Sequence, residues 1–544
     1  MSDTLRAPAW TPTVFTKPID TNAYRSVIDI FEEANSRFSD HVAFTNSGQS
    51  LTFKEVDEKS QAVAAYLQNE LGLKKGDRVA IMLPNILAFP VVMFGILRAG
   101  LVQVNVNPLY TPRELKHQLN DADTNTIFVF SGSSATLAEI IEDTPVKNVV
   151  IANVGDASGA NLPSPPAHEM FTDRSTVNDI ISVGERLDFE APVVSPTDLI
   201  FLQYTGGTTG LSKGAALSHG NLVANIMQFD AATDGFMTAG EEIVITALPL
   251  YHIFALMVNC LSFYWLGSRN VLITNPRDML GFVAELKNWK LSVITGVNTL
   301  FNGLLHTPGF DEVDFSNYQF AMGGGSAIQR AISDKWKLVT GHHIIEGYGL
   351  SETSPILSVN PFDSTEFTET VGQSMPMTEI KLLDSDDQEV PLGQPGELCA
   401  RGPQIMQGYW RKPEATSAVM TQDGFFRTGD IAIMDRRNNF KIVDRKKDMV
   451  LVSGFNVYPA EVEAVIAEIP GVVEVAVAGA SDERTGEAVK AFVVRSNDSV
   501  TPQSVQEYCH DALAAYKVPK QVEFLEELPK STVGKILRRE LRDR

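Results

Sequence analysis

The chain has 544 residues, of which 44% are hydrophobic and 21% are charged, and its formal net charge at pH 7 is -22. This composition is typical of a soluble globular enzyme, and the length predicts two or more domains. The acidic balance excludes general binding to nucleic acid and wholesale adsorption on anionic membranes, since both need a basic surface.

Cysteines and apolar segments bear on the compartment. Cys260, Cys399 and Cys509 lie far apart and form neither a metal-binding nor a disulfide pattern, which favours the reducing cytoplasm. The first residues lack the apolar segment of a secretory signal. The apolar run Ile86–Leu97 is too short to span a bilayer, and Val244–Gly267 is interrupted by a proline and polar residues. We predict that Val244–Gly267 is buried core and that the protein is cytoplasmic.

Up to about residue 440 the chain alternates short apolar runs with helix-like stretches. Arg78–Leu83 and Val102–Val106 are predicted strands, and Phe89–Arg98 between them is a predicted helix. Ser158–Pro166, rich in serine, glycine and proline, is a predicted surface loop. Strands that alternate with helices indicate an α/β fold, in which parallel sheets are covered by helices on both faces.

A segment rich in glycine and hydroxyl groups, Tyr204–Gly214, follows the strand predicted at Asp198–Gln203. Its spacing is not that of the P-loop, which needs Gly, four residues and then Gly-Lys-Ser/Thr. Ser218 is placed to cap a following helix with apolar residues at helical spacing. We therefore predict a strand, loop and helix in which backbone N–H groups, hydroxyls and Lys213 hold phosphates.

A charged cluster, Asp444–Asp448, separates the predicted strands Phe440–Val443 and Met449–Val452. Composition alone favours a solvated hairpin turn at this point. Beyond it, the pattern predicts a small α+β domain, with the charged turn as its boundary. The predicted elements are a helix after Pro459, strands Val473–Val477, Val489–Val494 and Val522–Leu525, and a helix Ser504–Tyr516.

Five short motifs stand along the chain in a fixed order. They are Tyr204–Gly214, Gly347–Glu352, Thr428–Asp430, Asp444–Arg445 and Pro529–Lys535. Their order and spacing resemble the adenylate-forming superfamily, which includes acyl-CoA synthetases, beetle luciferases and the adenylation domains of peptide synthetases. Further segments are similar to the subgroup of bacterial long-chain fatty-acid–CoA ligases. These are Leu248–Ala255, Ile273–Arg277, Gly296–Leu300 and Asp423–Gly454.

The resemblance covers essentially the whole chain and implies both architecture and reaction. It implies a large domain of mixed sheets covered by helices, residues 1–444, and a small mobile α+β domain, residues 445–544. The implied reaction has two steps. A fatty-acid carboxylate attacks the α-phosphate of ATP to give acyl-AMP and pyrophosphate, and the thiol of CoA then displaces AMP. The implied cofactor is Mg²⁺, and the implied co-substrates are ATP and CoA.

The resemblance also implies the residues that bind ATP. They are Thr205, Gly206, Gly207, Thr208, Thr209, Gly210, Lys213, Gly324, Gly325, Ser326, Gly347, Tyr348, Gly349, Ser351, Glu352, Asp430, Arg445 and Lys535. Thr205, Lys213, Glu352 and Lys535 are the implied catalytic residues, with Glu352 as the Mg²⁺ ligand. Ser351 departs from the family's usual threonine, so the hydroxyl is kept and the methyl group is lost.

Three further groups of residues are implied for the acyl substrate, CoA and the hinge. The substrate residues are Tyr251, His252, Asn298, Gly324 and Gly349; the CoA residues are Ser453, Gly454 and Phe455; and Lys447 is the hinge about which the small domain rotates. His252 is expected to shape or gate the site, because a carboxylate substrate is already ionised at neutral pH and needs no general base.

Several alternatives stay open at this stage. The substrate could be a medium-chain or other carboxylic acid, or the acyl group could pass to a separate carrier protein. A non-enzymatic nucleotide-binding regulator is disfavoured, because the charged positions of the motifs are all present. The sequence leaves peripheral membrane contact and a homodimer open. The basic tail of Lys535, Arg538, Arg539, Arg542 and Arg544 is either a solvated helical face or a membrane contact.

Overall fold

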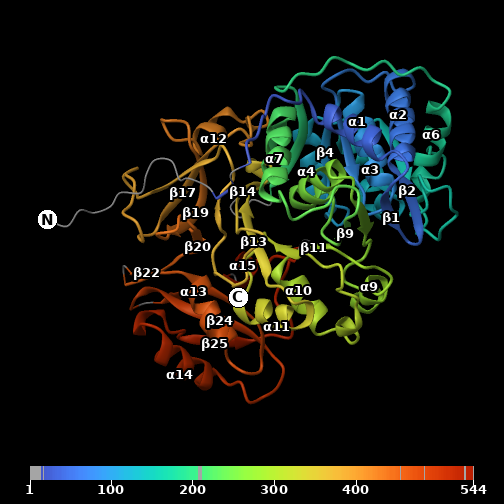
Figure 1. Ribbon diagram of the computed structural model, residues 1–544. Helices are drawn as coiled ribbons and strands as arrows, with labels where there is room; N and C mark the ends of the chain where they lie inside the picture. The colour runs from blue at the N-terminus through green and yellow to red at the C-terminus, as the bar shows by residue number, and fades with distance from the viewer. Residues whose placement is uncertain are drawn as a thin grey trace.

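The structure is a computed structural model that describes residues 14–15, 17–205, 211–453, 455–482, 484–531 and 534–542. In these residues the strands form sheets of seven, nine, four and five strands. In Figure 1 the two large sheets and their helices, blue to yellow, make up most of the molecule, and the C-terminal residues, red, form a small unit below them. The fold is the expected mixed α/β architecture with a large N-terminal and a small C-terminal domain.

The seven-stranded sheet is mainly parallel. Its strands are, in order, β18 (Gly408–Tyr409), β8 (Lys213–Ser218), β7 (Leu199–Thr205), β4 (Val102–Asn105), β3 (Arg78–Met82), β5 (Thr126–Phe130) and β6 (Asn148–Ala152). Only the pairs β7–β8 and β8–β18 of this sheet are antiparallel. Val79 and Ile81 join the core shared with the other large sheet, whereas Ala80 and Met82 pack with residues of α4 (Pro112–Ala122). Both faces are therefore covered, as the alternating pattern predicts.

The nine-stranded sheet has a parallel centre and antiparallel edges. Its strands are, in order, β15 (Gln373–Ser374), β14 (Ile356–Val359), β13 (Ile344–Gly349), β12 (Phe320–Gly323), β11 (Val293–Gly296), β9 (Ile243–Thr246), β10 (Arg269–Leu272), β1 (Val42–Asn46) and β2 (Gln49–Thr52). Strands β13 to β1 in this order pair in parallel. The carboxyl ends of these strands therefore meet at one edge, where ligand sites of such sheets usually lie.

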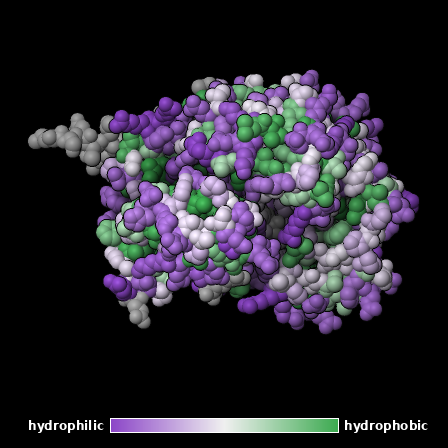
Figure 2. Space-filling view, turned by 90° about the horizontal axis from the view of Figure 1, so that it is seen from below, coloured by the Kyte–Doolittle hydropathy of each residue, from purple (hydrophilic) through white to green (hydrophobic). Residues whose placement is uncertain are grey.

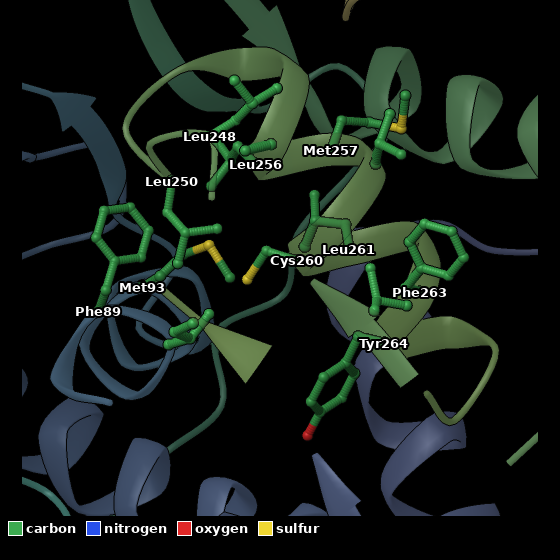
Figure 3. Packing of buried hydrophobic residues seen from close by; sticks show 14 of the residues in the cluster. Phe89, Met93, Leu248, Leu250, Leu256, Met257, Cys260, Leu261, Phe263 and Tyr264 are labelled. Carbon is green, nitrogen blue, oxygen red and sulfur yellow. The ribbon is translucent and has the colours of Figure 1, made fainter. Parts of the chain in front are cut away.

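One large core joins the two sheets. The helices that contribute buried residues to it include α1 (Val27–Phe38), α2 (Phe53–Asn69), α3 (Ala88–Arg98), α6 (Val177–Gly184), α7 (His219–Ala232), α8 (Phe263–Trp265), α9 (Met279–Leu286), α10 (Asn298–Leu305) and α11 (Arg330–Thr340). The short helix α5 (Ser134–Ala138) belongs with α4. A fully buried π-helix, Ala255–Ser262, runs through this core. Figure 3 shows Phe89 and Met93 of α3 pointing toward Leu250 and Cys260. The prediction that Val244–Gly267 is buried core is confirmed.

The remaining strands form two smaller sheets. One is antiparallel, in the order β16 (Glu379–Leu383), β17 (Gly396–Arg401), β19 (Phe426–Met434) and β20 (Phe440–Arg445), with α12 (Pro413–Ser417) nearby in sequence. The other contains β22 (Phe455–Val457), β21 (Val450–Val452), β24 (Gly486–Arg495), β23 (Val472–Asp482) and β25 (Gln521–Phe524), with α13 (Pro459–Ala467), α14 (Pro502–Ala512) and α15 (Arg538–Arg542). This second sheet has its own hydrophobic core.

Most predicted elements are confirmed to within a few residues, and two predictions are wrong. The glycine-rich loop does not lead directly into a helix, because β8 intervenes and Ser218 caps α7 only after that strand. The charged cluster is not a hairpin turn, because β20 pairs with β19 whereas β21 pairs with β22 and β24. The antiparallel sheet of β16 to β20 is an addition to the predicted fold.

Two arginines of the basic tail make hydrogen bonds within the protein. Arg538 donates to Glu463 at 2.7 and 2.9 Å, and Arg542 donates to the carbonyl groups of Lys447 and Asp448 at 3.2 and 3.0 Å. These arginines therefore fasten α15 to the rest of the small domain. Arg544 lies outside the described residues.

Among the described residues, no helix is both long and apolar enough to cross a membrane. The face seen in Figure 2 is mainly hydrophilic, with hydrophobic residues scattered among the polar ones. The three cysteines are buried and free.

Candidate active site

The ends of the glycine-rich loop are held by a β-hairpin. Thr205, the last residue of β7, lies opposite Lys213, the first residue of β8. The Lys213 ammonium lies 5.1 Å from the centre of the Tyr409 ring. The five predicted phosphate-binding residues between them, Gly206, Gly207, Thr208, Thr209 and Gly210, lie outside the described residues.

Glu352 follows β13 in a tight turn. Its side chain is buried and accepts a hydrogen bond from the Tyr409 hydroxyl at 2.7 Å. Burial raises the pKa of Glu352 above its ordinary value, and the Tyr409 hydrogen bond opposes that rise. Gly349 permits the turn, because a Cβ atom there would lie 1.8 Å from the carbonyl oxygen of Pro355. The Gly-Tyr-Gly sequence thus brings the chain back so that Glu352 points inward.

Asp430 and Arg445 face each other across β19 and β20. The Tyr348 hydroxyl donates to Asp430 at 2.6 Å, and the Arg445 guanidinium lies 3.4 Å from the same carboxylate. Asp430 is only 5% exposed, so its charge is shielded from water. Burial and this carboxylate both raise the pKa of Tyr348, which keeps the phenol protonated.

Lys535 enters the site from the small domain. The Thr299 hydroxyl of the large domain donates to the Gly534 carbonyl at 3.2 Å, and a Cβ atom on Gly325 would lie 3.1 Å from Lys535 Cε. Burial lowers the pKa of Lys535 to about 8; Arg445 lowers it as well, whereas Asp430 and Glu352 oppose the shift. The structure therefore brings Lys535 together with the groups from the middle of the chain.

His252 lies beside this lysine. Burial, with Lys535 as a second cause, lowers the pKa of His252 to about 3, so the imidazole is neutral at pH 7. Its Nδ1 accepts from the Phe254 backbone at 3.3 Å. The Tyr251 carbonyl accepts from Gln203 Nε2 at 3.1 Å, which ties this segment to β7.

The Gly-Gly-Gly-Ser segment and the Gly-Tyr-Gly segment lie next to each other. A Cβ atom on Gly324 would lie 3.3 Å from the Gly347 carbonyl and 3.1 Å from the ring of Phe254. Gly325 and Ser326 are exposed. Asn298, at the start of α10, accepts from the Gln329 backbone at 3.0 Å. The two backbones thus approach each other closely, with little room for a side chain at Gly324.

The predicted CoA and hinge residues lie in the small domain or at its entry. Ser453 donates its backbone N–H to the Thr485 carbonyl at 2.9 Å, and Phe455 stacks on Tyr516 with ring centres 5.0 Å apart. Phe455 is 58% exposed. Lys447 lies between β20 and β21, and Gly454 lies outside the described residues. These contacts of Ser453 and Phe455 stay within the small domain, and none joins the group around Lys535.

Two residues of this region were not predicted from the sequence. Tyr409 contacts both Glu352 and Lys213, and its two-residue strand has no periodic pattern that could reveal it. Asn85 bonds to the carbonyls of Thr246 and Leu248 at 3.1 and 3.0 Å and accepts from Leu250 at 2.8 Å, which holds the chain before Tyr251. A single asparagine after a buried strand gives no signal of this role.

A cavity of about 430 Å³ adjoins the group. Its lining includes the carboxylates of Glu352, Asp384, Asp387 and Glu397, the cationic residues Arg427 and Lys446, and Tyr409, Thr428 and Gly429. Cationic groups, buried carboxylates and closely packed glycines at the carboxyl ends of strands are suited to a phosphorylated ligand. This combination is that of a nucleotide-binding enzyme, with Lys535 of the small domain close to the large domain.

Comparison with known proteins shows the family to which the chain belongs. Residues 31–410 match the family described as "AMP-binding enzyme", and residues 461–535 match the "AMP-binding enzyme C-terminal domain". The chain belongs to the AMP-binding enzyme family.

Named relatives and solved structures agree with this membership. The chain is 50% identical to a long-chain-fatty-acid–CoA ligase of Escherichia coli, over 99% of this chain and 97% of that protein. It is 46% identical to one of Haemophilus influenzae, over 97% and 96%. ATP-bound MatB of Rhodopseudomonas palustris superimposes with a TM-score of 0.83 at 28% identity, covering 95% of this chain and 98% of that one. An anthranilate CoA ligase with anthranoyl-AMP shares the fold, with a TM-score of 0.87 at 23% identity over 96% and 98%.

Proposed function

We propose that the chain is an ATP-dependent, AMP-forming ligase that joins a long-chain fatty acid to CoA through an acyl-adenylate. The observation that carries the proposal is the packing of Lys535, from the small domain, against Gly325 of the large domain, where the charges of Glu352, Asp430 and Arg445 act on its pKa. The named bacterial relatives at 46 to 50% identity support the long-chain substrate.

Separate groups of residues bind the ribose, the adenine and the phosphates of ATP. Asp430 and Arg445 bind the ribose hydroxyls, since a carboxylate accepts and a guanidinium donates. Tyr348 packs against the adenine with its hydroxyl fixed on Asp430, and the Gly324 to Ser326 segment meets the base edge through its backbone. Thr205, Lys213 and the loop Gly206–Gly210 hold the β- and γ-phosphates, which leave as pyrophosphate.

The donor set around Glu352 fits Mg²⁺. Among the described residues, no cluster of three or more His, Cys, Asp or Glu side chains could hold a metal ion, but Mg²⁺ commonly takes one or two carboxylates together with substrate phosphates and water. Glu352 would supply that carboxylate, with Ser351 and its hydroxyl beside it. When bound, Mg²⁺ would neutralise part of the negative charge on the triphosphate. Glu352 must then be ionised, which the Tyr409 hydrogen bond favours.

Lys535 acts where two anions meet. The fatty-acid carboxylate and the α-phosphate repel each other, and a cation between them stabilises the charge that develops in the transition state. The lysine is charged below its pKa of about 8. Tyr251, His252, Asn298, Gly324 and Gly349 surround the carboxyl end of the substrate, and the neutral His252 shapes this space without taking a proton.

In the second step, the transfer of the acyl group to CoA, the small domain takes a different orientation. We take residues 1–444 and 445–544 as the two domains and Lys447 as the hinge, where few dihedral angles need to change. Rotation removes Lys535 from the site and brings Ser453, Gly454 and Phe455 to it, so that the pantetheine arm of CoA passes the glycine. The exposure of Phe455 supports this, because an aromatic ring on the surface is available for a ligand.

The location and assembly of the protein are further parts of the same proposal. The three buried free thiols are compatible with a cytoplasmic enzyme, since a reducing compartment keeps thiols unpaired. Peripheral membrane contact would serve a substrate that partitions into bilayers, but Arg538 and Arg542 of the basic tail are engaged within the protein. Membrane contact and a homodimer stay predictions.

The test is ATP-dependent consumption of CoA across saturated fatty acids from acetate to stearate, with AMP, ADP and pyrophosphate quantified. The proposal expects AMP, not ADP, and a maximum in the long-chain range. A maximum at short- or medium-chain acids would change the proposed substrate class and leave the adenylation chemistry standing. Pyrophosphate release with no consumption of CoA would point to an acyl-AMP ligase that serves a separate carrier protein.

A further inference from the structure

We propose that Tyr409 is a positioning residue that fixes the Glu352 carboxylate for the metal ion and the Lys213 ammonium for the phosphates. The inference rests on the proposed function, because it assigns Tyr409 to the same nucleotide site. The ring and the hydroxyl have separate tasks, and this separation makes the role testable.

The hydroxyl sets the orientation of Glu352. Tyr409 donates to Glu352 Oε1 at 2.7 Å, across 57 residues of sequence. The last torsion of a glutamate side chain is broad and only roughly two-fold, so a buried carboxylate without a partner could turn away from the site. The hydrogen bond restricts that rotation. Partners that orient a metal ligand commonly change metal affinity 10- to 100-fold when they are removed.

The ring of Tyr409 meets Lys213. The ammonium of Lys213 lies 5.1 Å from the ring centre, within the range in which an aromatic face attracts a cation. Lys213 begins β8, opposite Thr205 at the other end of the glycine-rich loop. A cation held over the ring stays at the base of the loop, where the phosphates are expected.

The backbone keeps Tyr409 in place. β18 pairs with β8, with Tyr409 opposite Ala215, and Trp410 donates to the Gly214 carbonyl at 2.8 Å. The Tyr409 N–H donates to the Thr416 hydroxyl at 2.9 Å, and Met406 donates to the Glu352 carbonyl at 2.8 Å. The strand that carries the tyrosine is therefore attached to both elements whose side chains it contacts.

The location of Tyr409 at a cavity supports a role in positioning Glu352 rather than a role only in core packing. Its side chain lines the cavity of about 430 Å³ together with Glu352, Thr428 and Gly429. A tyrosine that served only the core would have its hydroxyl in a sealed polar contact away from ligand space. Here the hydroxyl lies on the carboxylate that borders the cavity.

The test compares Tyr409→Phe, which removes only the hydroxyl, with Tyr24→Phe. Tyr24 is a matched control, because its hydroxyl also donates to a glutamate, Glu33, at 2.7 Å, far from the site in sequence and in an exposed pair. Mn²⁺ binding to the full chain with a non-hydrolysable ATP analogue is measured by electron paramagnetic resonance. Nucleotide affinity without metal and the melting temperature are measured alongside.

We expect Tyr409→Phe to weaken Mn²⁺ binding about 10-fold, with metal-free nucleotide affinity and melting temperature unchanged, and Tyr24→Phe to bind as wild type. Tyr409→Leu, which also removes the ring, should additionally weaken metal-free nucleotide binding through Lys213. Wild-type Mn²⁺ affinity in Tyr409→Phe would overturn the inference. So would a loss of metal-free nucleotide binding or of melting temperature equal to the loss of metal binding.

Failure of the proposed function is a different result. If the wild-type chain binds Mn²⁺ and nucleotide but forms no acyl-AMP from any fatty acid, the ligase proposal fails, and the Mn²⁺ titrations still decide the role of Tyr409.

Discussion

Replacement of Lys535 by alanine should separate the two half-reactions of the proposed ligase. Lys535 is held at the site by the Thr299–Gly534 hydrogen bond and by close contact with Gly325, so its ammonium is positioned before the reaction begins. Loss of one preorganised donor of this kind costs about 2.7–4 kcal/mol, or roughly 10²–10³-fold in rate. We expect that loss in acyl-AMP formation, because only this step brings two anions together.

Single-turnover release of pyrophosphate measures the first step, and thioester formation from supplied acyl-AMP and CoA measures the second. Lys535→Ala should slow the first by that factor and leave the second within a few-fold of wild type. Lys530→Ala is the control, since Lys530 lies in the same segment but pairs with Glu474 at 2.6 Å. Equal losses in the two half-reactions would refute the assignment of Lys535 to adenylation, as would an equal defect in the control.

Three further predictions address charge, the CoA path and the C-terminal helix. Because the lowered pKa of Lys535 is about 8, kcat/KM for acyl-AMP formation should fall as pH rises through about 8. Lys535→Arg should flatten that limb, since arginine keeps its charge, and a pH-independent wild type would contradict the assignment. Gly454→Leu should block thioester formation and spare acyl-AMP formation, whereas comparable loss of both steps would remove Gly454 from the CoA path. Arg538→Ala removes the guanidinium from Glu463, which keeps its hydrogen bond from the Val477 N–H, and should lower the free energy of unfolding by about 1.5–3 kcal/mol; the exposed neighbour variant Arg539→Ala should have little effect in the same denaturant titration.

The secondary structure was largely predictable because it depends on local patterns. A strand buried on both faces gives a continuous apolar run, as in β3, and Ser218 before α7 is of a residue type that caps helices. Strand β8, with the sequence Lys-Gly-Ala-Ala-Leu-Ser, has no such run, since its burial comes from pairing with β7 and β18. The charged cluster looked like a hairpin turn because no local pattern states which strand is the partner of β20.

The candidate site residues were predictable from the resemblance to a known family, whereas the contacts between them were not predictable from the sequence. Glu352 and Tyr409 each have an unremarkable setting in sequence, and only the pairing of β18 with β8 brings the hydroxyl to the carboxylate. Composition alone would place Lys535 in solvent. The segment that carries it is held at the large domain by the hydrogen bond between Thr299 and Gly534, which are 235 residues apart, a separation beyond any periodic pattern.

The arginines of α15 fasten the segment that carries Lys535, the lysine proposed for adenylation. Lys535 lies three residues before Arg538, whose guanidinium bonds to Glu463 on α13, and Arg542 bonds to the carbonyl of Lys447. The segment that carries Lys535 is thus fastened on one side to the small domain and on the other to the proposed hinge. A rotation about Lys447 would therefore move Lys535 as part of a rigid body, so one change of backbone dihedral angles could remove the adenylation lysine and deliver the CoA-binding residues together.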